Sequence, residues 1–323
     1  MTQPENTGPL AWIFPGQGSQ KVGMAGPWLK QSSTARRVFD EASEAVGMDL
    51  ARLCLEGPGE TLTATENAQP AIVTCGVAGL ALLRERGLEP AAVAGHSVGE
   101  FSALVAAGCL PLAPAVRAVR QRGQLMARVT APGKMLAVMG LDEARVQALR
   151  HEAAPHGVIA TALHNSPQQF VLSGSLAPLE RFQALALAAG AKECVMLQVS
   201  HAFHSPLMAE VQEEWRAVVA GLQLRMPRCP TVLNTTARTV KTLVCIRRSL
   251  VDQLTAPVLW MQCVRTLADL GITRVLEVSD SKVVSALARR TVPSLQALTL
   301  QDPTVLEGLL VKHGHRPPQA PVS

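Results

Sequence analysis

The chain has 323 residues, of which 48% are apolar and 17% charged, with a net charge of +5 and a pI near 9.0. These values are typical of a soluble globular protein, with one large domain or a domain that carries an insert, and they exclude global disorder. The arginine pairs are scattered and no aromatic residues interleave with them, so a nucleic-acid-binding role is not expected.

The seven cysteines are odd in number and include no Cys-x-x-Cys pair. This pattern favours reduced thiols over a disulfide framework or a zinc ribbon. No basic and apolar signal segment is visible at the N-terminus, and the apolar run 71–83 is too short to span a bilayer. We therefore expect a cytoplasmic monomer without membrane contact.

Apolar periodicity and turn residues predict a first series of elements in chain order. A short strand ends at Pro15-Gly16, two helical segments follow, and a second strand runs through a glycine turn into an alanine-rich helix. The expected elements are a strand at 11–14, helical periodicity at 32–55 and 68–86, a strand at 91–94 and a helix at 100–107.

The pattern changes between about 133 and 197, where strands and helices alternate in the order β-α-β-β-α-β that is typical of a ferredoxin-like unit. We expect strands at 135–140, 158–163, 169–173 and 193–199, and helices at 142–151 and 176–189. A further strand at 274–278 resumes the larger α/β pattern. The sequence thus predicts a discontinuous large domain (1–130 and 199–312), a small subdomain (131–198) and a disordered, proline-rich tail (313–323).

Gly95-His96-Ser97-Val98-Gly99 has the pattern of a nucleophile elbow, in which a serine sits in a sharp turn between strand and helix. Such a turn projects the hydroxyl toward substrate, and the helix N-terminus behind it favours a developing oxyanion. A bare Gly-x-Ser-x-Gly is a weak signal, and the alternative is a glycine-rich turn that carries a solvated serine. The apolar run before it and the helix after it favour the elbow.

A serine nucleophile needs a base, and Ser200-His201-Ala202-Phe203-His204 offers two candidates among the eight histidines. His-x-x-His is also compatible with metal binding. No helical His-Glu-x-x-His and no obvious third ligand accompany it, so no metal site is expected. Chain order alone does not choose between His201 and His204.

Four motifs together resemble the malonyl-CoA:acyl carrier protein transacylases and the acyltransferase domains of polyketide synthases. They occur in the order Phe14-Pro15-Gly16-Gln17-Gly18-Ser19-Gln20, Gly95-His96-Ser97-Val98-Gly99-Glu100, Gln121-Arg122-Gly123-Gln124-Leu125-Met126 and His201-Ala202-Phe203-His204. The resemblance extends from about Trp12 to Leu287. It implies a hydrolase-like α/β parallel-sheet core with an inserted ferredoxin-like subdomain, in agreement with the change of pattern above.

The resemblance also implies roles for individual residues. Ser97 would be the acylated nucleophile and His204 the base, oriented by the backbone carbonyl of Gln253. The backbone N–H groups of Gln17 and Val98 would form the oxyanion hole. The residues expected to bind substrate are Arg122, Gln69, Phe203, His201 and Asn165.

Arg122 is the residue that indicates a carboxylated acyl group as substrate. A planar guanidinium can hold a carboxylate through two hydrogen bonds, which a monocarboxylic acyl chain cannot offer. Without the resemblance, a surface helix arginine would be the preferred interpretation. Phe203 would crowd a branch at the acyl C2 atom, a discrimination worth about 1–3 kcal/mol.

One segment departs from the family pattern. Residues 277–282 (Glu-Val-Ser-Asp-Ser-Lys) stand where family members often carry Gly-Pro after the late core strand. The departure puts the local loop and its carrier-protein contact in question, but not the chemistry.

The resulting hypothesis is ping-pong transfer of a malonyl group from coenzyme A to the phosphopantetheine thiol of an acyl carrier protein, without a permanently bound cofactor. It would serve polyketide or fatty-acid biosynthesis, and the His-Ala-Phe-His block favours a free-standing enzyme of a polyketide pathway. The alternatives are an editing acyl-carrier hydrolase, a transferase of an unusual acyl unit between carriers, a generic serine esterase and a non-catalytic carrier-binding module.

Overall fold

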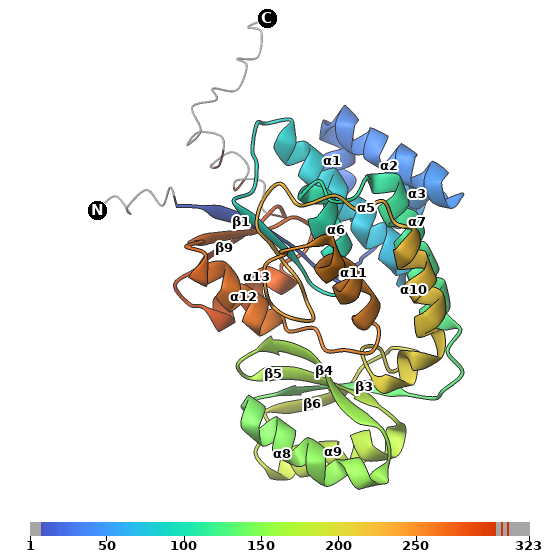
Figure 1. Cartoon of the computed structure of the whole chain (residues 1–323), viewed down its shortest axis with the longest axis vertical. Helices are drawn as coiled ribbons and strands as arrows, with labels where there is room; N and C mark the ends of the chain where they lie inside the picture. Colours follow the sequence, from blue (N-terminus) through green and yellow to red (C-terminus); the bar gives the residue numbers. More distant parts are fainter. Residues whose placement is uncertain (1–7, 302–304, 306–308, 310–323) are drawn as a thin grey trace, which may run out of the picture.

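The structure is a computed structural model that describes residues 8–301, 305 and 309. Two sheets organise it: a five-stranded parallel sheet in the large part of the molecule and a four-stranded antiparallel sheet beside it (Figure 1). The expected tail, 313–323, lies outside the described residues.

The parallel sheet has the strand order β7-β2-β1-β8-β9. Its strands are β1 (Leu10–Phe14), β2 (Ala92–Gly95), β7 (Thr231–Val232), β8 (Arg274–Glu277) and β9 (Gln296–Thr299). β1 and β2 are buried along their whole length, as expected for short apolar strands covered on both faces. The strands predicted at 11–14, 91–94 and 274–278 are present, whereas β7 and β9 were not anticipated.

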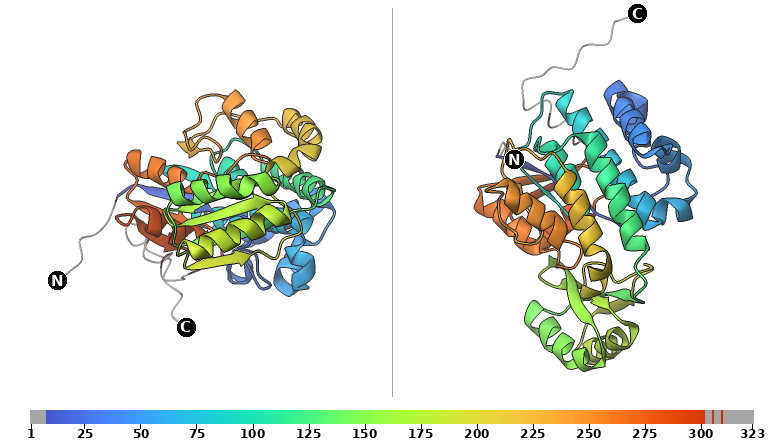
Figure 2. Two further views of the ribbon diagram at one scale, coloured as in Figure 1. Left: turned by 90° about the horizontal axis from the view of Figure 1, so that it is seen from below. Right: turned by 45° about the vertical axis from the view of Figure 1, so that its right-hand side comes forward.

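Helices cover both faces of the parallel sheet (Figures 1 and 2). They are α1 (Gly26–Gln31), α2 (Ser33–Val46), α3 (Leu50–Glu56), α4 (Gly59–Thr63), α5 (Thr65–Arg84), α6 (Gly99–Ala106), α7 (Leu112–Ala127), α10 (Gln212–Gly221), α11 (Leu243–Asp252), α12 (Trp260–Asp269) and α13 (Val283–Thr291). The helical periodicity at 32–55 is divided into α2 and α3. Gly47 adopts φ 63° and ends α2, and Asp49 caps α3.

The small sheet has the order β4-β5-β3-β6 and carries two helices on the face turned away from the large part (Figure 1). Its elements are β3 (Lys134–Met139), α8 (Glu143–Ala153), β4 (Ile159–Ser166), β5 (Gln169–Gly174), α9 (Leu176–Ala188) and β6 (Glu193–Met196). The expected β-α-β-β-α-β order is therefore present, although β6 ends at Met196 rather than at residue 199. The exact limits of the subdomain, 131 and 198, remain a prediction.

The two sheets are connected through buried contacts. One apolar cluster packs α8 and α9 against the small sheet, while Met135, Ala162 and Val171 on its other face belong to the cluster of the large part. Ala162 and His164 exchange backbone hydrogen bonds with Val258 at 2.9 and 3.0 Å. These contacts hold the small sheet against the large part of the molecule, and the candidate site lies at the boundary between the two, called the seam below.

Candidate active site

Ser97 lies in the turn between β2 and α6, as the elbow pattern predicts. Its φ of 51° is left-handed, a conformation that a non-glycine residue adopts at a cost. The flanking glycines permit the turn: a Cβ at Gly95 would lie 2.0 Å from the Gly99 oxygen, and a Cβ at Gly99 would lie 2.5 Å from the Phe14 oxygen. Only glycine fits either position, so the serine is held in this conformation by the chain around it.

His204, rather than His201, faces the serine. Its Nε2 lies 2.8 Å from Ser97 Oγ, and its Nδ1 lies 2.7 Å from the backbone oxygen of Gln253. Because a carbonyl only accepts, Nδ1 carries the proton and Nε2 is free to accept from the serine hydroxyl. The arrangement is a serine–histidine pair whose third member is a backbone carbonyl.

Burial keeps the imidazole of His204 neutral. Desolvation, the Arg122 cation and His96 lower the pKa of His204 to about 3, against the opposing effect of the Gln253 carbonyl. A neutral imidazole is the form that can accept a proton. The base is therefore in its active form over the whole range around neutrality.

The loop after β1 lies directly against the elbow. A Cβ at Gly16 would come within 2.6 Å of the His96 oxygen, so the chain passes closely enough to bring Gln17 beside Ser97. Among the described hydrogen bonds, the backbone N–H groups of Gln17 and Val98 donate none. Two free amides on the cavity wall beside a nucleophile have the composition of an oxyanion hole.

A cavity of about 810 Å³ opens over the serine, between the elbow and the small sheet. Its wall contains Ser97, Val98, His204, Arg122, Phe203 and Gln17. The small sheet contributes Met135 and Leu163, and the segment that follows β6 contributes Leu197, Gln198, Val199 and Ser200. The volume is in the range of sites for drug-sized ligands, and both sheets contribute to it.

Arg122, on α7, is a buried cation in the cavity wall. Its Nη1 donates to Gln69 Oε1 at 2.8 Å and its Nη2 to Gln253 Oε1 at 3.0 Å, whereas its buried Nε has no partner among the described residues. The surface-arginine alternative is therefore wrong. A guanidinium held by two amides, with donors left over, is arranged to bind an anion.

Three residues expected to bind substrate are not in the cavity wall. Gln69 is buried behind Arg122, and Asn165 Oδ1 lies 2.9 Å from Nε2 of His96, whose ring does line the cavity. His201 is half-buried, with Nδ1 2.7 Å from Ser200 Oγ. Gln69 and Asn165 thus contact residues that line the cavity, and the roles of all three remain predictions.

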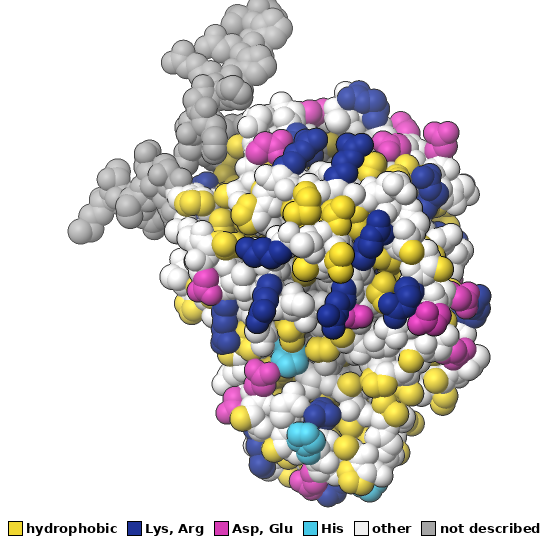
Figure 3. All heavy atoms as spheres, viewed as in Figure 1, with side chains coloured by type: hydrophobic (Ala, Val, Ile, Leu, Met, Phe, Trp, Pro, Cys, Tyr) yellow, Lys and Arg dark blue, Asp and Glu magenta, His cyan; other side chains and the backbone are white. Residues whose placement is uncertain are grey.

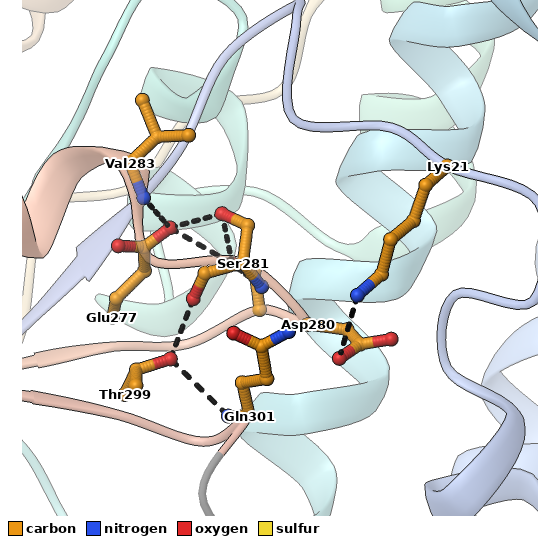
Figure 4. A network of polar contacts seen from close by, with 8 residues as sticks. Lys21, Glu277, Asp280, Ser281, Val283, Thr299 and Gln301 are labelled. Atoms are coloured by element: carbon orange, nitrogen blue, oxygen red, sulfur yellow. Dashed lines mark hydrogen bonds and ion pairs between the residues drawn. The ribbon is translucent and has the colours of Figure 1, made fainter.

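The segment that departs from the family pattern is held by a dense network (Figure 4). The buried Glu277 carboxylate accepts from Ser279 Oγ at 3.2 Å, from Ser285 N and Oγ at 2.8 Å each, from Val283 N at 3.2 Å and from Ser281 Oγ. It thereby satisfies donors in the first turn of α13. Asp280 pairs with Lys21 at 3.4 Å, so the loop is tied to the segment after Gln17.

The described residues offer neither a cluster of metal ligands nor a membrane-spanning helix. Within the part of the chain that the structure describes, no three His, Cys, Asp or Glu side chains come together as metal ligands. No helix in that part is both long enough and apolar enough to cross a membrane.

The comparisons with known proteins agree with this geometry. Residues 11–312 match the family described as acyl transferase domain. This chain is a member of the acyl transferase family. The match covers both sheets, the elbow and the cavity wall, so the serine–histidine pair belongs to an acyltransferase.

Relatives of this acyltransferase include the malonyl CoA-acyl carrier protein transacylases of Bacillus subtilis (36% identical, 92% of this chain and 95% of that protein) and Escherichia coli K12 (38% identical, 93% and 98%). Among solved structures, the malonyl-CoA:acyl carrier protein transacylase of Xanthomonas oryzae is 41% identical, with a TM-score of 0.90 over 96% of this chain and 99% of that one. A malonyl-transacylase solved with a type II polyketide synthase acyl carrier protein is 34% identical, with a TM-score of 0.91 over 94% and 99%.

Sequence reasoning assigned no role to three buried polar residues behind the site. Glu100, Asn234 and Ser249 are almost fully buried, and the Asn234 backbone N–H and the Ser249 hydroxyl both donate to Glu100. The sequence could have indicated a role for Glu100, because a carboxylate in an otherwise apolar, alanine-rich helix is costly to bury unless it is hydrogen-bonded. Asn234 and Ser249 gave no such signal, since their partners at the elbow, Ser97 and Glu100, are more than 130 residues away in the chain.

Proposed function

We propose that this acyltransferase moves a malonyl group from coenzyme A to the phosphopantetheine thiol of an acyl carrier protein, through an ester on Ser97. The single observation that carries the malonyl part of the proposal is the buried Arg122 in the wall of the cavity over Ser97. The names of its relatives, which describe malonyl transfer to acyl carrier protein, support the same assignment.

In the first half-reaction, His204 Nε2 takes the proton of Ser97 while Oγ attacks the thioester carbonyl. The oxyanion forms beside the backbone N–H groups of Gln17 and Val98, and the sulfur of coenzyme A leaves with the proton from His204. In the second half-reaction the carrier thiol gives its proton to His204 and attacks the ester, and Ser97 regains the proton. The Gln253 carbonyl keeps the imidazole in one tautomer throughout.

Arg122 supplies the preference for a carboxylated acyl group. Its unpartnered Nε and its remaining N–H groups can donate to the malonyl carboxylate inside the cavity. An acetyl group would leave this buried cation without a bound anion, and this difference disfavours acetyl relative to malonyl.

The carrier protein is proposed as a partner partly from surface charge. Figure 3 shows Lys and Arg side chains spread over one face of the large part, more numerous there than Asp and Glu. Together with the net charge of +5, this surface favours an acidic partner and the phosphates of coenzyme A. We also propose a cytoplasmic location and a monomeric state, in keeping with substrates that are made and used inside the cell.

An editing hydrolase with the same Ser97–His204 pair is the nearest alternative. It would release the acyl group to water and would have little use for a carboxylate-binding arginine. A non-catalytic module would not require a serine and a histidine at 2.8 Å. The choice between a fatty-acid and a polyketide pathway depends on which carrier protein is accepted.

The test of the malonyl assignment is Arg122→Ala, with Arg128→Ala as the matched control. Arg128 follows the same helix and pairs with Glu214 on the surface, away from the cavity. Loss of two charge-assisted hydrogen bonds at about 1.5–3 kcal/mol each predicts that kcat/KM for malonyl-CoA falls about a hundredfold or more in Arg122→Ala. The control should be unchanged, and equal kcat/KM for malonyl-CoA in wild type and Arg122→Ala would refute the assignment.

A further inference from the structure

Glu100 is a buried carboxylate three residues after the nucleophile, and none of the transfer steps above uses it. Its side chain has no exposed surface. Its Oε2 accepts from the Asn234 backbone N–H and from Gln253 Nε2, each at 3.0 Å, and its Oε1 accepts from Ser249 Oγ at 3.0 Å. Burying a carboxylate is costly even with such partners, so its presence behind the site calls for a physical explanation.

Two of the three donors lead directly to the active site. Asn234 Oδ1 accepts from the backbone N–H of Ser97 at 2.7 Å, and its Nδ2 donates to the Gly95 oxygen. Gln253 carries the carbonyl that holds the base, and its side chain reaches Arg122. Glu100 is therefore one hydrogen-bonded residue away from both the elbow and the arginine.

Glu100 determines how the Gln253 amide is turned. Because the carboxylate only accepts, the amide presents Nε2 to Glu100 and Oε1 to Arg122 Nη2, which donates to it at 3.0 Å. Gln69 Oε1 holds Nη1 on the other side at 2.8 Å. The two amides fix the guanidinium plane, so Glu100 decides indirectly which N–H groups of Arg122 stay open.

Glu100 and Arg122 also influence one another through charge. Burial lowers the pKa of Arg122 to about 10, and the Glu100 carboxylate opposes this decrease. Burial raises the pKa of Glu100 to about 7, against the effects of its hydrogen bonds and of the Arg122 cation. Glu100 therefore changes charge near neutrality, while Arg122 stays a cation.

We propose that Glu100 is a specificity-determining positioning residue, which orients Arg122 through the Gln253 amide and supplies the negative charge that an acyl carboxylate replaces. The inference rests on the proposed function, because it takes Arg122 as the site of that carboxylate. When the acyl carboxylate arrives, two anions face one cation, and Glu100 takes up a proton. Charged Glu100 thus weakens binding of carboxylated acyl groups, and neutral Glu100 strengthens it.

Among the described residues, no other ionisable side chain on the elements packed against α6 hydrogen-bonds to Glu100. The neighbouring strands β1 and β2 have no ionisable side chains. On α5, the ionisable side chains are those of Glu66, Cys75 and Arg84, and none of them hydrogen-bonds to Glu100. Cys263 on α12 faces Glu100, and burial together with the Glu100 charge raises the pKa of this thiol far above neutrality.

The test compares kcat/KM for malonyl-CoA with kcat/KM for acetyl-CoA in the intact enzyme, from about pH 6 to about pH 8.5. The ratio of the two removes effects common to both substrates, such as those of the phosphates and of His204. Glu100 is neutral below its pKa and charged above it, so the wild-type ratio should fall by at least about threefold as pH rises through 7. A ratio that is flat with pH in the wild type would overturn the proposal.

Glu100→Gln removes the negative charge of this side chain but keeps its hydrogen bonds, so it distinguishes the effects of the two. The amide oxygen can take the place of Oε2, and the amide nitrogen can donate to Ser249 Oγ, so the network keeps its shape. The ratio in this variant should be flat with pH and at least as high as the wild-type ratio at low pH. Gln253→Leu keeps the backbone carbonyl for His204 but removes the side-chain bridge between Glu100 and Arg122, so the malonyl to acetyl ratio should fall.

Glu277→Gln is the matched control, because Glu277 is an equally buried carboxylate that accepts from several donors (Figure 4). Among the described hydrogen bonds, none joins Glu277 to a residue of the cavity wall. It should lower thermal stability and leave the ratio and its pH dependence unchanged. If Glu100→Gln lowers kcat/KM for malonyl-CoA and for acetyl-CoA by the same factor, Glu100 has only a structural role, and the proposal is overturned. Failure of the wild type to transfer malonyl at all would instead refute the proposed function.

Discussion

At the scale of single residues, reactivity depends on the protonation state of His204. Burial lowers the pKa of this imidazole to about 3, so the base stays neutral as pH falls from 7 to 5. A solvent-exposed histidine would be largely protonated by then. The acylation rate with acetyl-CoA, which has no carboxylate for Arg122, should therefore vary little over that interval.

The measurement is pre-steady-state acylation of Ser97 by acetyl-CoA between about pH 5 and about pH 7. A decrease that follows a pKa near 6.5, the ordinary value for histidine, would contradict the burial argument. His204→Ala should reduce acylation by about 10²–10⁴-fold at every pH, because general-base assistance is lost.

Substitution of Phe203 tests whether packing in the cavity wall selects the acyl group. Its side chain is buried in the cavity wall, and the resemblance to the acyltransferases predicts that it contacts a substituent at the acyl C2 atom. Phe203→Ala should raise kcat/KM for methylmalonyl-CoA relative to malonyl-CoA by about 10-fold to 100-fold, the range set by one methyl group. Competition between the two substrates measures the ratio directly, and an unchanged ratio would place the selecting contact elsewhere.

At the scale of elements, the strand–turn–helix unit of β2 and α6 depends on close backbone approach. A Cβ at Gly99 would lie 2.5 Å from both the Phe14 and the Pro15 oxygens, which belong to the end of β1 and the loop that leads to Gln17. Backbone atoms cannot yield as a flexible side chain can. Gly99 therefore allows the loop that leads to Gln17 to lie directly against the elbow.

Gly99→Ala should lower the melting temperature and reduce acylation of Ser97, because the loop that carries Gln17 has to move. A destabilisation of about 1–3 kcal/mol is expected for such overpacking. Gly221→Ala is the control, since a Cβ there meets nothing within 4 Å at the end of α10. Equal melting temperatures and rates for the two variants would show that the close approach is unimportant.

The elements themselves were largely predictable from the sequence, and the long-range contacts were not. Strict apolar runs bounded by glycine indicated β1 and β2, and the β-α-β-β-α-β order indicated the small sheet. β7 has only two residues and β9 is half-buried, so neither gave a periodic signal. Ser97 and His204 followed from motifs, whereas Glu100 and Asn234 depend on contacts across more than 130 positions.

At the scale of the whole molecule, the cavity belongs to neither sheet alone. Its wall combines the elbow and Gln17 from the large part with Met135 and Leu163 from the small sheet. Occupation by an acyl group should therefore slow backbone exchange on both sides of the seam. Hydrogen–deuterium exchange of the malonylated enzyme should show protection at 16–20 and at 197–200, and protection confined to one side would argue that the small sheet does not contribute to the site.

The most direct test of the central claim is the intact mass of the protein after incubation with malonyl-CoA, followed by addition of a phosphopantetheinylated carrier protein. We predict a malonyl adduct in the wild type that is absent in Ser97→Ala and that passes to the carrier when the carrier is added. An adduct that decays to free malonate at the same rate with or without carrier would contradict the account and indicate a hydrolase. The absence of any adduct in the wild type would refute the assignment of Ser97 as the nucleophile.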